Sequence, residues 1–468
     1  MGAENVKLFF YEPLATESPL GFNMKKDRKA ILGWALYDWG NSAFATTVMA
    51  GFFPIFFKQY WSHGVDVNMS TAQLGLGNAL ASLLVALMAP VLGAIADKGG
   101  ARKKLLIFFA YLGVLMTAAL FVVQKGEWAW AIFVYAIGSI GFAGANIFYD
   151  SLLPGITSKK NIDFVSAFGF SMGYLGGGIL FLVNVLMTLM PEKFGLPDAG
   201  MAVRVSFILV AVWWGFFTVF TIMWVPEDSR SGNSKKAVDV IVDGFRQFFS
   251  TLKKVRHLKT VLTFLLAYWF YIDGVDTIIK MAVDYGMSIG FQPNDLIKAL
   301  LITQFVGFPA ALLFGKLGQN WGVRKSIYLA IGIYICVTIW GTMMTEKHEF
   351  YILAIVIGLV QGGIQALSRS YYSRLIPKNK AAEFYGFYNM LGKFAAILGP
   401  MLMGVVGLLV RRLLMPPSPT LEQIVNVGQI ASRWGIGSIL LLFIIGAVLF
   451  YFVDEEKGRA EIAVLSEE

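Results

Sequence analysis

The sequence predicts an all-α integral membrane protein with twelve transmembrane helices in two pseudo-symmetric six-helix halves. Three observations predict this class. Of the 468 residues, 57% are hydrophobic and only 15% are charged, whereas soluble proteins carry about 25% charged residues. The apolar residues come in blocks of about 20 or more, long enough to cross a hydrocarbon core about 30 Å thick. The chain also repeats itself, with an offset of about 220 residues.

Twelve apolar blocks supply the expected spans. They lie at residues 30–57, 72–96, 104–124, 128–153, 163–190, 202–225, 260–284, 296–318, 325–345, 349–376, 382–410 and 430–453. The expected organisation is a tail (1–29), a first half (30–225), a linker (226–259), a second half (260–453) and a tail (454–468). The linker stretch VDVIVDGFRQFFSTLKKVRHL fits either an amphipathic helix on the membrane surface or a solvated helix.

The basic residues orient these spans. With an even number of spans both tails share one side, and the segments on that side hold about 27 of the 39 Lys and Arg residues. The positive-inside rule then places both termini in the cytoplasm, with the plasma (inner) membrane as the expected location. The net charge of +9 is therefore a topology signal, and we expect no nucleic-acid partner.

A repeated motif links the two halves. The loop after the second span reads GAIADKGGARKK (93–104), and the loop after the eighth reads GKLGQNWGVRKS (315–326). Gly93, Gly100, Arg102 and Lys103 match Gly315, Gly322, Arg324 and Lys325 at constant offset, while Gln319 stands where Asp97 stands. The stretches YDSLLP (149–154) and YSRLIP (372–377) also correspond.

These features resemble the major facilitator superfamily, which is built from two parallel halves around a central site. The first loop resembles the signature between its second and third helices, which implies a conformational latch formed by Asp97, Arg102 and Lys103. The stretches YDWGNSAFAT (37–46), GYLGGG (173–178) and YIDGVDTII (271–279) resemble the branch that includes the fungal autophagy-related vacuolar effluxers. That resemblance implies passage of amino acids.

The first and seventh spans each carry polar residues on one helix face. Asp38, Asn41 and Ser42 are spaced i, i+3, i+4, and a carboxylate at the centre of a membrane helix costs about 2.5–3.5 kcal/mol on insertion scales. We expect them to line a central cavity, although Asp38 could instead pair with a neighbouring helix as structural support. Asp273, Asp276 and Thr277 repeat the spacing.

Three basic residues also fall inside spans: Lys280, Arg369 and Lys393. Lys280 follows Asp276 at i+4, so that pair could neutralise itself within one helix. Arg369 and Lys393 could snorkel to the membrane surface, or one of them could hold a substrate carboxylate, for which Arg provides the better fork. Asp38, Asp273 and Asp276 balance these three cations if they pair.

A glycine series in the fifth span has the spacing of helix packing. Gly169, Gly173 and Gly177 are four residues apart, and small residues at this spacing let membrane helices approach closely. We expect a packing seam there, which could slide during transport.

The sequence contains no nucleotide-binding loop, zinc motif or nucleophile elbow. With one cysteine, no disulfide forms within the chain. We therefore expect no enzyme activity, cofactor or metal. The function expected is a monomeric secondary transporter for a small polar solute, an amino acid or similar zwitterion, working by alternating access with a proton as candidate coupling ion. A lipid scramblase or a non-transporting sensor on the same fold is the alternative.

Overall fold

A computed structural model describes residues 24–63, 83–97, 100–227, 246, 258–458 and 460–461. Its first span runs without a break through α1 (Met24–Ala43), a π-helical segment η2 (Phe44–Phe52), α2 (Phe53–Phe56) and η3 (Phe57–Trp61). The first half continues with the helix Leu83–Asp97, α4 (Arg102–Ala119), α5 (Trp128–Ile156), α6 (Ile162–Leu189) and α7 (Ala199–Trp224).

The second half contains α9 (Lys259–Ser288), α10 (Pro293–Trp321), α11 (Val323–Met343), α12 (Lys347–Arg374), α13 (Ala381–Leu414), α14 (Leu421–Ser438) and α15 (Leu440–Tyr451). Among the described residues nine helices are long and apolar enough to span a membrane, with α14 and α15 counted as one. The helix Leu83–Asp97, α4 and α13 fill the three remaining predicted spans, so the twelve-helix plan is confirmed.

Some predictions fall on parts of the chain outside this description. Residues 1–23 and 462–468 of the two tails lie outside it, as does the start of the second predicted span, 72–82. Most of the linker 226–259, including all but Arg246 and Leu258 of its proposed amphipathic helix, also lies outside the described residues.

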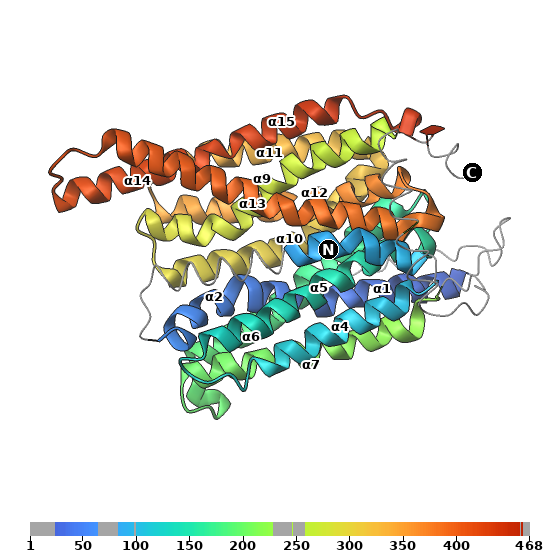
Figure 1. Cartoon of the computed structure of the whole chain (residues 1–468), viewed down its shortest axis with the longest axis horizontal. Helices are drawn as coiled ribbons and strands as arrows, with labels where there is room; N and C mark the ends of the chain where they lie inside the picture. The colour runs from blue at the N-terminus through green and yellow to red at the C-terminus, as the bar shows by residue number, and fades with distance from the viewer. Residues whose placement is uncertain are drawn as a thin grey trace, which may run out of the picture.

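The helices run side by side in two groups, with α1 to α7 in one and α9 to α15 in the other (Figure 1). Each group buries an apolar core of its own. The internal repeat is visible in the packing, because α1 lies along α6 and α7 while α9 lies along α13 and α15. The groups meet mainly where α6 contacts α10 and α12, and where α5 contacts α13.

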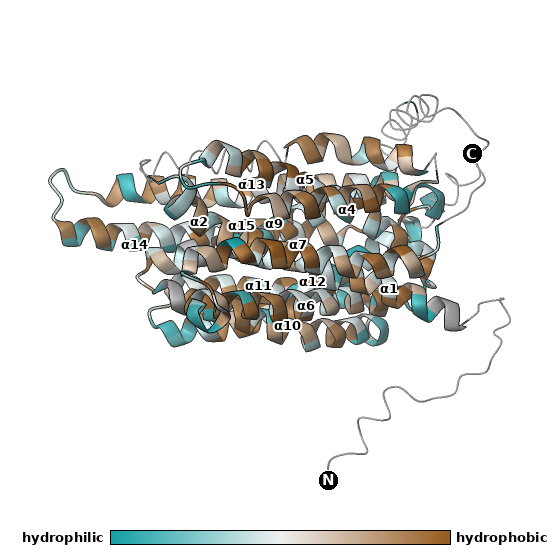
Figure 2. Cartoon of the chain, turned by 90° about the horizontal axis from the view of Figure 1, so that it is seen from below, coloured by the Kyte–Doolittle hydropathy of each residue, from teal (hydrophilic) through white to brown (hydrophobic). Residues whose placement is uncertain are grey.

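The outside of the bundle is apolar over the middle of its length. Hydrophobic residues predominate in the middle of the helices, and hydrophilic residues gather at both ends (Figure 2). Large apolar side chains such as Leu115, Val212 and Leu313 are about two-thirds exposed. Such a surface suits contact with lipid rather than water, and the protein is accordingly an integral, multi-pass membrane protein.

One end of the bundle gathers the first residues of α1, α4, α6, α9 and α13 and the last residues of α5, α10, α12 and α15 (Figure 1). We call it the terminal face. The two copies of the repeated loop motif lie on this face, one between Leu83–Asp97 and α4 and the other between α10 and α11.

Candidate functional site

Asp38 lies in the first half, at the contact between α1, α5 and α6. Its Oδ1 accepts a hydrogen bond from the Ser42 hydroxyl at 3.3 Å, and its Oδ2 accepts one from the Tyr149 hydroxyl at 3.2 Å. Tyr149 in turn stacks on Trp34, with ring centroids 4.4 Å apart. Asn41, on the same helix face, donates to the Asn146 side chain on α5 at 2.6 Å. The polar face of α1 thus contacts other helices of its own half.

Arg369 on α12 joins the two halves. Its Nη1 donates to Asp150 Oδ1 at 3.1 Å, while Nε and Nη2 donate to the hydroxyl and the carbonyl oxygen of Ser166 at 2.9 and 2.7 Å. Asp150 belongs to α5 and Ser166 to α6, so every one of these bonds crosses from the second half to the first. The Arg369 side chain is only 3% exposed and that of Asp150 11%, so this is a buried ion pair.

Aromatic rings surround the Arg369 guanidinium. Its central carbon lies 4.3 Å from the centroid of the Phe170 ring, 4.8 Å from that of Trp34 and 5.4 Å from that of Tyr149. Cations at such distances are attracted by the ring faces. We call Asp38, Tyr149, Asp150, Ser166 and Arg369 the inter-half cluster. It contains two carboxyl groups and one guanidinium: Asp150 bonds Arg369 directly, and Tyr149 links Asp38 to Arg369.

The second half adds a further donor to this cluster. Asn389 on α13 donates to Asp150 Oδ2 at 3.2 Å, so both oxygens of Asp150 are bonded to residues of the opposite half. The Tyr385 hydroxyl donates to the Arg369 carbonyl oxygen at 3.0 Å, which holds α12 against α13.

Asp273 occupies the position in the second half that Asp38 has in the first. Its Oδ1 accepts from the Thr277 hydroxyl at 3.2 Å and from the backbone N–H of Gly399 on α13 at 3.0 Å. The carboxyl group is fully buried, and its Oδ2 accepts no hydrogen bond from a described residue. The bonds of Asp38 and of Asp273 therefore stay within their respective halves.

The other predicted cations have different settings. Lys280 Nζ lies 3.9 Å from Asp276 Oδ2 on the same helix, and its side chain is 47% exposed, so these two residues pair locally. Lys393 lies in α13, but its side chain is outside the described part of the structure.

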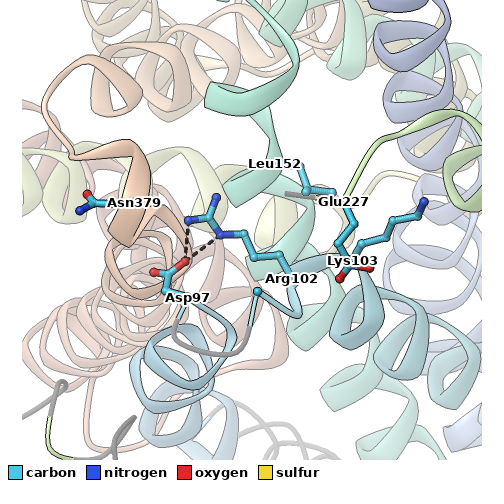
Figure 3. Close-up of a pocket in the computed structure, with 7 residues that line it drawn as sticks. Asp97, Arg102, Lys103, Leu152, Glu227 and Asn379 are labelled. Carbon is cyan, nitrogen blue, oxygen red and sulfur yellow. Dashed lines mark hydrogen bonds and ion pairs between the residues drawn. The ribbon is translucent and has the colours of Figure 1, made fainter. Parts of the chain in front are cut away.

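The predicted latch residues Asp97, Arg102 and Lys103 line a small pocket, and Asp97 and Arg102 point toward each other there (Figure 3). Asp97 pairs with Arg102 at 2.6 Å and accepts hydrogen bonds from the backbone N–H groups of Ala382 and Glu383, in the first turn of α13. Arg102 also donates to the Lys378 carbonyl oxygen at 2.9 Å. Both residues of this pair thus bind the second half.

Burial raises the pKa of the Asp97 carboxyl group above its usual range, and Arg102 opposes that shift. Lys103 lies apart from this contact, because its Nζ donates to the Val225 carbonyl oxygen at 2.6 Å, after the end of α7. Burial lowers the pKa of Lys103.

The glycine series lies where α6 meets α1. A methyl group added at Gly169 would lie 2.7 Å from both the Trp34 ring and the Tyr149 hydroxyl, and one at Gly173 would lie 2.5 Å from the Ser42 hydroxyl. At Gly177 it would lie 3.0 Å from the Thr46 hydroxyl. The series therefore brings α6 close to the Asp38 face of α1.

Sequence reasoning missed several members of the cluster. Asp150 was visible only as an acid near a span end, and Tyr149 only as part of the repeated YDSLLP stretch. Ser166 and the second inter-half ion pair, between Asp163 at the start of α6 and Arg374 at the end of α12, were not predicted. The sequence feature that could have identified these residues is their position, because each lies within two turns of a predicted helix end on the terminal face.

Comparison with known proteins places the chain in a family. A family model described as "Vacuole effluxer Atg22 like" matches residues 26–74, 64–163 and 157–407. A Bacillus subtilis protein described as the uncharacterized MFS-type transporter YxiO is 38% identical, over 93% of this chain and 97% of its own. Autophagy-related protein 22 of Yarrowia lipolytica is 22% identical, over 83% of this chain and 76% of its own.

Solved structures support the same fold. The human organic anion transporter MFSD10 aligns with a TM-score of 0.63 at 13% identity, over 93% of this chain and 100% of its own. The proton:xylose symporter XylE, bound to a deoxyglucose derivative, also aligns with a TM-score of 0.63, at 14% identity over 95% and 99% of the two chains. The chain therefore belongs to the Atg22-like family of major facilitator superfamily transporters.

Proposed function

We propose that this transporter moves a small polar solute, an amino acid or similar zwitterion, by alternating access and with proton coupling. The inter-half cluster carries the proposal. A zwitterion has one carboxylate and one ammonium group, and the cluster offers a guanidinium for the first and two carboxylates for the second. Because Arg369 already binds Asp150, a solute carboxylate would have to replace that bond and would thereby loosen the contact between the halves.

The position of the cluster supports alternating access. Arg369 lies five residues before the end of α12 and Asp150 six before the end of α5, about two turns or less from the terminal face. Together with the contacts of Asp97 and Arg374, these bonds close the terminal face. We place this face in the cytoplasm from the basic residues around it, so the described arrangement is the one closed to the cytoplasm.

Proton coupling rests on two buried carboxyl groups. Ionised Asp273 would leave its Oδ2 buried without a donor, and an unsatisfied buried acceptor costs about 1–3 kcal/mol or more. Protonation would remove the charge from this buried group and so lower the cost. Asp38 is linked to Arg369 through Tyr149, while Asp150 bonds Arg369 directly. The cluster thus holds two acids and one base, and a proton on Asp38 would bring it to neutrality.

The test is amino-acid flux in proteoliposomes, with and without an imposed proton gradient. We expect wild-type flux that responds to the gradient, and at least tenfold lower flux for Asp38→Asn. Asp198→Asn is the matched control, because Asp198 caps α7 on the surface and Asn caps equally well. Unchanged flux in Asp38→Asn would remove Asp38 from the mechanism. Flipping of fluorescent lipids without amino-acid flux would overturn the proposal in favour of a scramblase.

A further inference from the structure

A cavity of about 450 Å³ opens on the terminal face, beside the second copy of the loop motif. Its size is within the range of about 300–1,000 Å³ that is typical of ligand sites. Lys159 and Lys160, between α5 and α6, line one side. The end of α10 and the start of α11, with Gln319 and Lys325, line the other. We call this cavity the second-copy pocket. It belongs neither to the inter-half cluster nor to the Asp97 contact.

In the first copy of the loop motif, a carboxylate of the chain itself fills the corresponding position. There the Asp97 carboxylate binds Arg102 and the first-turn N–H groups of α13. The cavity that remains is only about 20 Å³, enough for about one water molecule. An internal anion therefore occupies the basic site of the first copy.

The second copy has the same architecture but lacks this anion. Gly315 packs against the first turn of α6, near Asp163 and Ala167, as Gly93 packs against the first turn of α13. Gln319 replaces the acid, and its side-chain amide donates to the Lys160 carbonyl oxygen at 3.4 Å. The carboxylate that seals the first copy is thus absent from the second, and an open basic cavity is present instead.

The charges around the second-copy pocket are strongly unbalanced. It is lined by five cationic side chains, Lys159, Lys160, Arg324, Lys325 and Arg374, and by two anionic ones, Asp163 and Glu455. Both acids bind Arg374. Lys159, Lys160 and Lys325 are exposed and form no ion pair with a described residue. Three cations are therefore available to a ligand.

We propose that the second-copy pocket binds a phosphate group, carried by an acidic phospholipid of the adjoining leaflet or present as free phosphate. Several lysines converging on one cavity suit a phosphate as point-charge donors. Trp321, on the rim, is 48% exposed, and tryptophan is typical of the headgroup level of a membrane. The phosphate takes the place that the Asp97 carboxylate has in the first copy.

The pocket also joins the two halves, because Lys159 and Lys160 belong to the first and Lys325 and Arg374 to the second. A bound phosphate therefore stabilises the closed terminal face. This consequence rests on the alternating-access mechanism proposed above, whereas binding itself does not, so failed amino-acid transport would leave the binding result standing.

The test uses the full chain in nanodiscs of phosphatidylcholine alone or of phosphatidylcholine mixed with phosphatidylglycerol. The readouts are the thermal unfolding temperature and the phospholipid retained in native mass spectrometry. A second arm adds inorganic phosphate to the protein in detergent, against chloride at matched ionic strength. We expect phosphatidylglycerol, phosphate or both to raise the unfolding temperature of the wild type by several degrees, and the arm that responds identifies the source of the phosphate.

Two variants and one control make the result specific to the pocket. The double variant Lys159→Gln/Lys160→Gln removes two cations. Gln319→Asp, with a side chain one methylene shorter, supplies the carboxylate that the first copy of the motif has at this position. Both should lose most of the stabilisation and of the retained acidic lipid. Lys125→Gln/Lys193→Gln, with the same charge change at exposed positions at the opposite end, should keep both. No stabilisation in either arm, or equal stabilisation of Gln319→Asp and the wild type, would overturn the proposal.

Discussion

At the scale of single residues, the decisive feature is a buried cation between two halves. Breaking a buried ion pair by removing one partner typically costs about 3–5 kcal/mol, because the remaining charge stays buried. Arg369→Gln or Asp150→Asn should each lower the thermal unfolding temperature strongly. The double variant should lose less than the sum of the two, because it leaves neither charge unpaired. Losses that simply add would show that the 3.1 Å contact carries no coupling energy.

A second residue-scale prediction concerns the shape of the cation. Lysine retains the charge of Arg369 but cannot bond Asp150 and both oxygens of Ser166 at once, and it stacks less well on Trp34 and Phe170. Arg369→Lys should therefore fold but transport at least tenfold more slowly in the proteoliposome assay. Wild-type flux in this variant would mean that only the charge matters.

The sequence identified Arg369 and Asp38 because an ionisable residue in an apolar block is conspicuous in a single chain. It could not pair Arg369 with Asp150, which is 219 residues away. That pairing depends on the rotation and depth of two helices in different halves, which packing decides. The local pair Asp276–Lys280 was predictable, because both partners lie one turn apart on one helix.

At the scale of helices, close approach of α6 to α1 depends on glycine. A methyl group at Gly176 would meet the Trp39 carbonyl oxygen at 2.5 Å, and backbone cannot move aside as a side chain can. Gly176→Ala should thus cost about 1–3 kcal/mol, as overpacking does, and lower the unfolding temperature in detergent. Gly332→Ala on α11 is the control, since nothing lies within 4 Å of the added methyl. It should be neutral or stabilising, because alanine favours the helix by up to about 1 kcal/mol.

Helix packing also includes features that the sequence pattern does not predict. The spacing of Gly169, Gly173 and Gly177 predicts a close contact, but not that the partner is α1 or that Gly173 faces Ser42. The π-helical segment Phe44–Phe52 follows the polar face of α1 and left no signal, because its apolar residues fit an ordinary helix equally well. Such segments occur frequently at functional sites, which agrees with its position next to Ser42.

At the scale of the molecule, the two halves are similar in fold, but the two copies of the loop motif make different contacts where the halves meet. The repeat and the twelve spans were readable from the sequence, since hydropathy and motif spacing are local. The conformation was not, because one sequence encodes every state of a transport cycle. The contacts of Asp97 with α13, of Asp150 with Arg369 and of Asp163 with Arg374 all close the terminal face.

The Asp97 contact is one of the three that join the halves at the terminal face. Asp97→Asn removes the charge that pairs with Arg102 and weakens the bonds to the first turn of α13. Without the carboxylate, Arg102 keeps only its bond to the Lys378 carbonyl oxygen across the halves. We therefore expect this variant to populate an arrangement open at the terminal face.

Spin labels can measure that opening. Ser158 and Lys378 are exposed on the terminal face, one in each half, and Cys336 is the one native cysteine to replace, by serine. Pulsed electron-electron resonance on labels at these two positions should give a single short distance in the parent protein and an added longer one in Asp97→Asn. Asp198→Asn, at the start of α7 on the opposite end, should leave the distribution unchanged. An unchanged distribution in Asp97→Asn would mean that the Arg369 and Arg374 pairs close the face without it.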